Sequence, residues 1–177
     1  FLAKWLVEQK HCKYTYRIIF VPETIGSIAY LSLNYQQMKK NVKAGFNVTC
    51  VGDNRSYSYL PSRKGNTLSD SVAKHVLNWL DPNFIEYAWT DRGSDERQYC
   101  APGIDLPVVS IMRTKYGEYP EYHTSLDNFK LVTLKGIKGG FIVAKTAIEI
   151  LLKMIIPKNY FLCEPQMGKR NLYRSIS

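Results

Sequence analysis

Segments typical of strands alternate with segments typical of helices along these 177 residues, and this alternation constrains the fold more than any other feature. The expected strands, rich in β-branched and aromatic residues, are 14–21, 45–51, 84–89 and 106–112. The expected helices, with apolar residues at helical spacing, are 24–40, 68–80 and 134–155. We therefore expect an α/β domain with helices on both faces of one sheet.

Polar and charged residues directly follow three of the expected strands. Pro22-Glu23-Thr24 follows the first strand, Gly52-Asp53-Asn54 follows the second, and Arg113 through His123 follows the strand at 106–112. In α/β sheets, ligands bind in the crevice beyond the carboxyl ends of the strands. Long polar loops at that edge often carry the chemistry, so we expect the functional site there.

Two carboxylates stand at these strand ends. Glu23 could serve as a general base or a metal ligand, or it could interact with the dipole of the helix that follows. Asp53 could bind a cation, because hard oxygen donors suit one when they are held in fixed positions. It could equally close an Asx turn, since Asp-Asn is favourable turn chemistry. The residues alone leave both pairs of alternatives open.

One of the three histidines, His123, lies in a loop that is crowded with carboxylates such as Glu118 and Glu121. A loop histidine among carboxylates is a better ligand candidate than a histidine within a helix, such as His75. The alternative is that His123 caps the backbone of its own loop.

The loop Arg92-Gly-Ser-Asp-Glu-Arg97 packs four charges into six residues. Its arginines could hold a substrate carboxylate and its acids, Asp95 and Glu96, could hold an amine. The alternative is a cluster of solvated ion pairs, which is what most charge-rich segments form.

Composition argues against several other classes of protein. The net charge is +9, but the basic residues are scattered, so nucleic-acid binding is not expected. No apolar run approaches the roughly 20 residues of a membrane span. No GxSxG, P-loop or GxGxxG motif occurs. The four cysteines form no CxxC pair, and we expect reduced thiols in a cytoplasmic protein.

Three stretches resemble a known family: PETIGSIAYL, RGSDERQYCAPGIDLPVVSIMR and YGEYPEYHTSLDN. They are similar to a bacterial aminopeptidase-like domain family, which is related to the transferrin-receptor-like zinc aminopeptidases and the glutaminyl cyclases. This resemblance implies a three-layer αβα fold of the zinc-exopeptidase type, with a mixed sheet and helices on both faces.

The resemblance also assigns roles to individual residues. Glu23 matches the general base of a Glu-Glu-x-Gly turn, although Thr24 stands where that group has a metal-binding Glu. Asp95 matches a second catalytic-site carboxylate. The expected metal ligands are Asp53, with Cys50 as an alternative, and His123. The remaining expected groups bind substrate or orient the histidine: they are Arg92, Glu96, Arg97, Arg113 and Tyr122, with Asp127 behind His123.

The expected function is zinc-dependent hydrolysis of a peptide N-terminus or a small amide. One or two zinc ions would be liganded partly by residues outside this chain, which looks like a C-terminal fragment incomplete at its N-terminus. Residues 1–157 would belong to the α/β domain, and 158–177 would form a basic tail or linker. The alternative is a non-catalytic peptide- or glycan-binding domain on a degraded zinc-peptidase fold, favoured by Thr24.

Overall fold

A four-stranded mixed sheet forms the centre of the computed structural model, which describes residues 1–155, 157–164 and 166–173. The strands are β1 (Gly45–Val48), β2 (Ser58–Leu60), β3 (Ile85–Glu86) and β4 (Val108–Met112), in the order β1-β4-β2-β3. β4 pairs in parallel with β1 and antiparallel with β2, and β2 pairs in parallel with β3. All five residues of β4 are buried, and β4 is the longest of these four strands.

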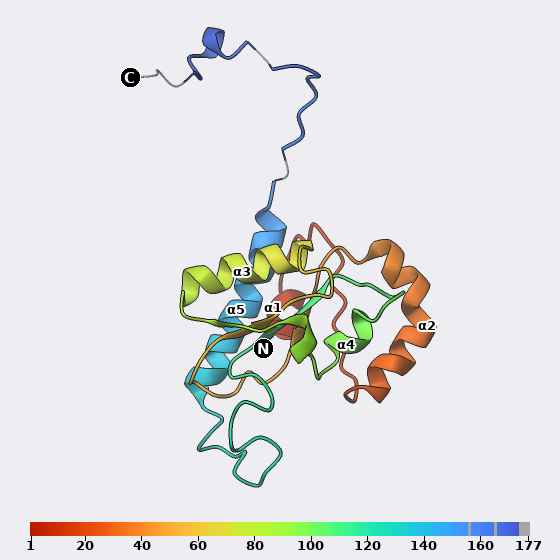
Figure 1. Cartoon of the computed structure of the whole chain (residues 1–177), viewed down its shortest axis with the longest axis vertical. Coiled ribbons are helices and arrows are strands. Elements are labelled where there is room, and N and C mark those ends of the chain that lie inside the picture. Colours follow the sequence, from red (N-terminus) through yellow and green to blue (C-terminus); the bar gives the residue numbers. More distant parts are fainter. Residues whose placement is uncertain (156, 165, 174–177) are drawn as a thin grey trace.

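Helices cover both faces of this sheet. The helices are α1 (Leu2–Val7), α2 (Ile25–Asn41), α3 (Leu68–Leu80), α4 (Glu96–Tyr99) and α5 (Leu134–Lys153), with 3-10 turns at Trp89–Asp91 and Gly168–Arg170. α3 and α5 lie together on one face, and α2 and α4 lie on the other (Figure 1).

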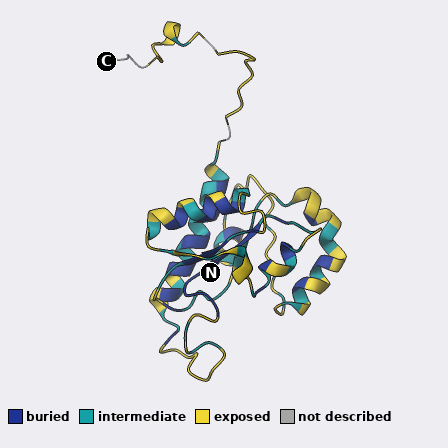
Figure 2. Cartoon of the chain, in the orientation of Figure 1, coloured by how far each residue is buried: buried dark blue, intermediate teal, exposed yellow. Residues whose placement is uncertain are grey.

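Alternation along β4 produces these layers, because successive side chains of a strand point to opposite faces. Val109 and Ile111 join the core under α3 and α5. Val108 instead packs with residues of α2 and α4. The buried residues accordingly gather in the sheet and on the inward sides of the helices (Figure 2). The expected three-layer α/β fold is confirmed.

The three long helices were predicted within one or two residues of their ends, but the strand expected at 14–21 is wrong. Residues 14–21 form no strand, and Phe20 is 85% exposed. Composition favours a strand only where the backbone also finds a pairing partner, and this segment is paired with none of the four strands. Conversely, β2 and α4 lie within stretches expected to be loops.

A buried carboxylate fixes the start of α3. Asp70 accepts hydrogen bonds from the hydroxyls of Tyr59, Ser62 and Thr67 and from the backbone N–H groups of Ser62 and Thr67. Burial opposes ionisation, but these donors outweigh it and lower the pKa of Asp70. Asp70 forms a capping box with Thr67, and its hydrogen bond from Tyr59, a residue of β2, ties the start of α3 to the sheet.

Residues 157–164 and 166–173 lie apart from the α/β body (Figure 1). The domain boundary expected near residue 157 stays a prediction, and residues 174–177 of the expected tail lie outside the described residues. Among the helices of the described residues, none combines the length and apolar character that a membrane crossing requires.

Glycines allow α5 to pack closely against the loop that follows β1. A Cβ on Gly136 would collide with the carbonyl oxygens of Gly52 and Asp53, and a Cβ on Gly140 would lie 2.6 Å from the Cβ of Val51. The loop that carries Asp53 is therefore held against the first turns of this helix.

We predict that Gly136→Ala lowers the free energy of unfolding by about 3 kcal/mol, because the added methyl group forces the loop away from α5. Helix propensity alone would raise stability by about 1 kcal/mol, so the sign of the change is informative. Urea denaturation measures it, with the exposed neighbour substitution Lys135→Ala as control. Equal or greater stability of Gly136→Ala would contradict this packing.

Candidate functional site

Glu23 lies on a strained turn immediately before α2. Its side chain is exposed, and its carbonyl oxygen accepts a hydrogen bond from the Ile25 N–H at 2.7 Å. This i→i+2 bond makes a γ-turn centred on Thr24, whose φ of 62° and ψ of −71° are costly for a β-branched residue. A turn of this kind persists only where the surrounding structure holds it.

Two of the residues predicted for the site hold that turn. The Asp95 carboxylate accepts a hydrogen bond from the Thr24 N–H at 2.7 Å. The Arg97 guanidinium donates to the Thr24 hydroxyl at 2.8 Å. The structure therefore brings Asp95 and Arg97 together beside Glu23, although more than 70 positions separate them from Thr24 in the chain.

Glu96, between these two residues, is completely buried. One of its carboxylate oxygens accepts hydrogen bonds from the N–H groups of Gly93 and Ser94 and from the Tyr116 hydroxyl. The other accepts from Asn47 and Ser110. In place of the substrate contact expected of it, Glu96 therefore connects β1, β4 and two loops inside the protein.

Asp53 is also committed to internal contacts. Its carboxylate accepts hydrogen bonds from the Arg55 N–H at 2.8 Å, and from the N–H and the hydroxyl of Thr114 at 2.9 and 2.7 Å. The bond to Arg55 is the Asx turn that the sequence offered as the alternative to a cation site. Both oxygens of this carboxylate therefore accept hydrogen bonds from the protein.

Arg113, expected to bind substrate, is buried beside Asp53. Its Nε donates to the Asp53 carbonyl at 3.0 Å, and its guanidinium lies 3.7 Å from the centre of the Tyr57 ring. The Arg113 guanidinium thus holds the loop after β1, and the residue is buried.

Cys50 and the aromatic loop after β4 lie on the Glu23 side of the sheet. Burial raises the pKa of the Cys50 thiol, and the negative charges of Asp53 and Glu23 raise it further. The Tyr119 hydroxyl contacts the Cys50 sulfur at 3.8 Å. Burial and the Glu23 charge likewise raise the pKa of Tyr122. Cys50 and Tyr122 both pack against the core cluster of Leu60, Met112 and Tyr116, and the Glu23 charge acts on both of them.

His123 stacks on Tyr122, with ring centres 3.9 Å apart, and is itself exposed. Asp127 is exposed too, and the hydrogen bonds found among the described residues include none between its carboxylate and His123. Arg92 lies over the Trp89 ring at 4.9 Å and remains exposed.

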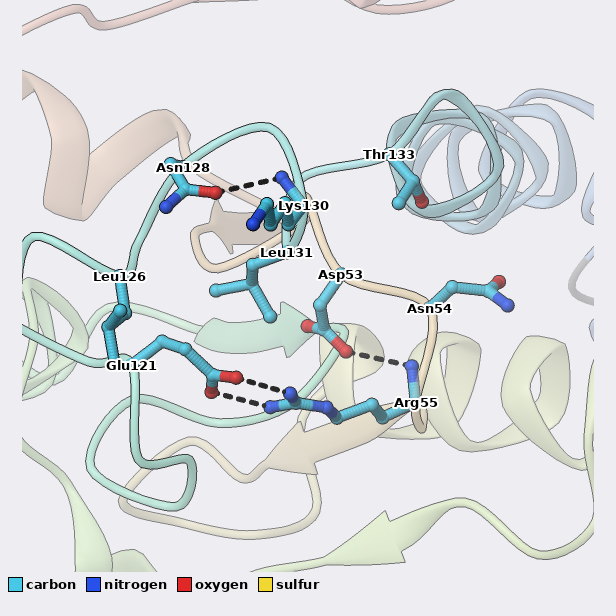
Figure 3. Close-up of a pocket in the computed structure, with 9 residues that line it drawn as sticks. All are labelled: Asp53, Asn54, Arg55, Glu121, Leu126, Asn128, Lys130, Leu131 and Thr133. Carbon is cyan, nitrogen blue, oxygen red and sulfur yellow. Dashed lines mark hydrogen bonds and ion pairs between the residues drawn. The ribbon is translucent and has the colours of Figure 1, made fainter.

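A cavity of about 410 Å³ is lined by Asp53 together with residues of the loop that precedes α5 (Figure 3). Its lining includes Lys130 and Leu131 and an ion pair in which Arg55 and Glu121 face each other with two hydrogen bonds of 2.9 and 2.6 Å. Sequence reasoning missed this pair, because nothing in the local sequence relates two residues 66 positions apart. Asp53 is the only predicted site residue in its lining.

No group of three or more His, Cys, Asp or Glu side chains is arranged to hold a metal ion within residues 1–155, 157–164 and 166–173. Of the expected ligands, Asp53 is bonded internally, whereas His123 is exposed. The residues that the structure describes do not by themselves fit a zinc ion.

Comparison with solved structures defines the class of fold. A Legionella pneumophila structure, the LapA aminopeptidase, is 20% identical over 75% of this chain and 36% of its own, with a TM-score of 0.56. The aminopeptidase from Aneurinibacillus sp. strain AM-1 is 17% identical over 77% of this chain and 33% of its own, with a TM-score of 0.57. These similarities show that the chain has an aminopeptidase-like fold.

The chain belongs to the family described as "Domain of unknown function (DUF4910)", whose profile matches residues 1–153. A relative from Clostridium acetobutylicum, the "Putative polysaccharide biosynthesis protein with aminopeptidase-like domain", is 40% identical over 99% of this chain. A crystal structure of a "putative peptidase" from the same organism is 38% identical over 96% of this chain, with a TM-score of 0.83. The chain spans 40% of the length of each of these two relatives.

We predict that Asp53→Asn lowers the free energy of unfolding by about 2 kcal/mol, because an amide nitrogen would face the Thr114 N–H. The loss should be the same with a metal chelator present, since the role of the carboxylate is structural. Thermal unfolding with and without chelator measures it, with the exposed Asp127→Asn as control. A loss that appears only when metal is supplied would show that Asp53 is a ligand after all.

Proposed function

We propose that the protein is an aminopeptidase-type hydrolase that cleaves a peptide N-terminus or a small amide, with Glu23 as its general base. The observation that carries this proposal is the strained γ-turn, which presents an exposed carboxylate and is held by Asp95 and Arg97. Strained backbone of this kind clusters at active sites, where the fold holds it for a purpose. The aminopeptidase-like name of the relative supports the same class of reaction.

In this reaction Glu23 accepts a proton from the attacking water and delivers it to the leaving amine. Arg92, on the loop before α4, and Arg97, in α4, have exposed side chains that can bind a substrate carboxylate or stabilise a developing oxyanion. Tyr122, whose pKa is raised by burial and by the Glu23 charge, offers a ring against which the substrate can pack.

We expect zinc because the chain resembles a family related to zinc aminopeptidases. One or two ions would need ligands from outside this chain, because the described residues do not fit a site alone. Besides Asp53, the candidate donors that the resemblance names in this chain are Cys50 and His123. We assign no step of the proton transfer at Glu23 to an ion.

A second candidate is a non-catalytic domain that binds a peptide or a glycan on the same fold. Two observations favour it: Asp53 is bonded internally, and Thr24 replaces the acidic residue of the wider group. The relative's description as a polysaccharide biosynthesis protein is consistent with a glycan as the bound group.

We predict that the intact protein hydrolyses at least one member of a panel of aminoacyl-p-nitroanilides, and that Glu23→Gln lowers kcat by about 100-fold or more with little change in KM. Glu86→Gln is the matched control, since Glu86 is a partly exposed carboxylate paired with Lys74. Equal kcat values for Glu23→Gln and the wild type would rule out Glu23 as the base.

We predict about one or two zinc ions per chain in the intact protein, measured by plasma mass spectrometry after incubation with zinc and desalting. His123→Ala should lower this content, whereas His75→Ala, an exposed histidine on α3, should leave it unchanged. An intact protein that binds no zinc would favour the non-catalytic binding domain over the metallohydrolase.

A further inference from the structure

Glu96 is a completely buried charge that accepts five hydrogen bonds. Its five donors are Asn47, Ser110, the Tyr116 hydroxyl and the N–H groups of Gly93 and Ser94, at 2.8 to 3.0 Å. A buried charge is tolerated only when it is fully hydrogen-bonded. Burial opposes its ionisation, but the donors outweigh burial and lower the pKa of Glu96.

These donors determine where the loop before α4 lies. Gly93 and Ser94 are fixed to the Glu96 carboxylate through their N–H groups, and the Gly93 N–H also donates to the Tyr116 hydroxyl at 2.7 Å. The loop is packed so tightly that a Cβ on Gly93 would lie 2.7 Å from the Tyr116 ring. A loop held in this way leaves its next residue, Asp95, little freedom.

Asp95 and Arg97, on either side of Glu96, are the residues that hold Thr24. Glu96 is therefore the chain neighbour of both residues that bond to Thr24, the central residue of the strained turn that presents Glu23. Asn47 and Ser110 anchor the other oxygen of Glu96 to β1 and β4, which pair in parallel in the sheet.

We propose that Glu96 is a positioning residue: through the Gly93–Asp95 loop it holds Asp95 against the Thr24 N–H, and so fixes the γ-turn and the Glu23 carboxylate. This inference rests on the function proposed for Glu23. Glu96 itself does not touch the substrate, because its side chain is completely buried.

The test follows the Thr24 N–H group in the intact protein by NMR after ¹⁵N-threonine labelling. In the wild type, its short bond to a carboxylate gives a downfield amide signal and slow hydrogen exchange. Glu96→Gln and Asp95→Asn should both move this signal upfield and speed its exchange by about tenfold or more. Glu86→Gln should change neither quantity. Tyr116→Phe, which removes one donor and is less disruptive, should give a smaller shift in the same direction if Glu96→Gln does not fold.

If the protein hydrolyses a substrate, Glu96→Gln should lower kcat by about tenfold or more with little change in KM. Because both residues act on the same turn, kcat of the double variant Asp95→Asn/Glu96→Gln should be no lower than kcat of the less active single variant. An unchanged Thr24 signal in a folded Glu96→Gln or Tyr116→Phe variant would overturn the positioning role, whatever the activity. A shifted Thr24 signal in a protein without hydrolase activity supports the positioning of the turn and contradicts only the proposed function.

Discussion

The buried carboxylate of Glu96 is the interaction on which the architecture of this site depends. It joins the parallel pair β1 and β4, through Asn47 and Ser110, to the loop that leads into α4. Removing a buried charge from water is costly, and only a complete set of donors offsets that cost. Five donors therefore surround one side chain, and the loop that carries Asp95 and leads into α4 is held around it.

The residues around the sheet edge divide into two groups with different physical roles. Asp53, Glu96 and Arg113 are buried and bonded internally, so they shape the loops. Glu23, Arg97 and His123 are exposed and lie on or near these loops, so they can meet a ligand. A rigid buried layer beneath an exposed polar layer is the arrangement that keeps catalytic groups in fixed positions.

The fold class and the long helices could be predicted from the sequence, because apolar periodicity and helix caps such as Thr67 act over a few residues. Residues 14–21 show the limit of that reasoning, since strand-forming side chains do not supply a pairing partner. The family resemblance, and not the order of strands and loops, placed Glu23 and Asp95 in one site. Neither could show that the neighbouring Glu96 is buried, because burial is decided by contacts with Asn47 and Ser110 far away in sequence.

Native-state hydrogen exchange of the intact protein tests whether Glu96 fixes the loop before α4. The N–H groups of Gly93 and Ser94 should exchange about as slowly as those of β4, although neither residue lies in a helix or strand. Exchange of these two groups at the rate of an unstructured peptide would contradict this role of Glu96, because a carboxylate that did not hold them could not place Asp95 beside Glu23.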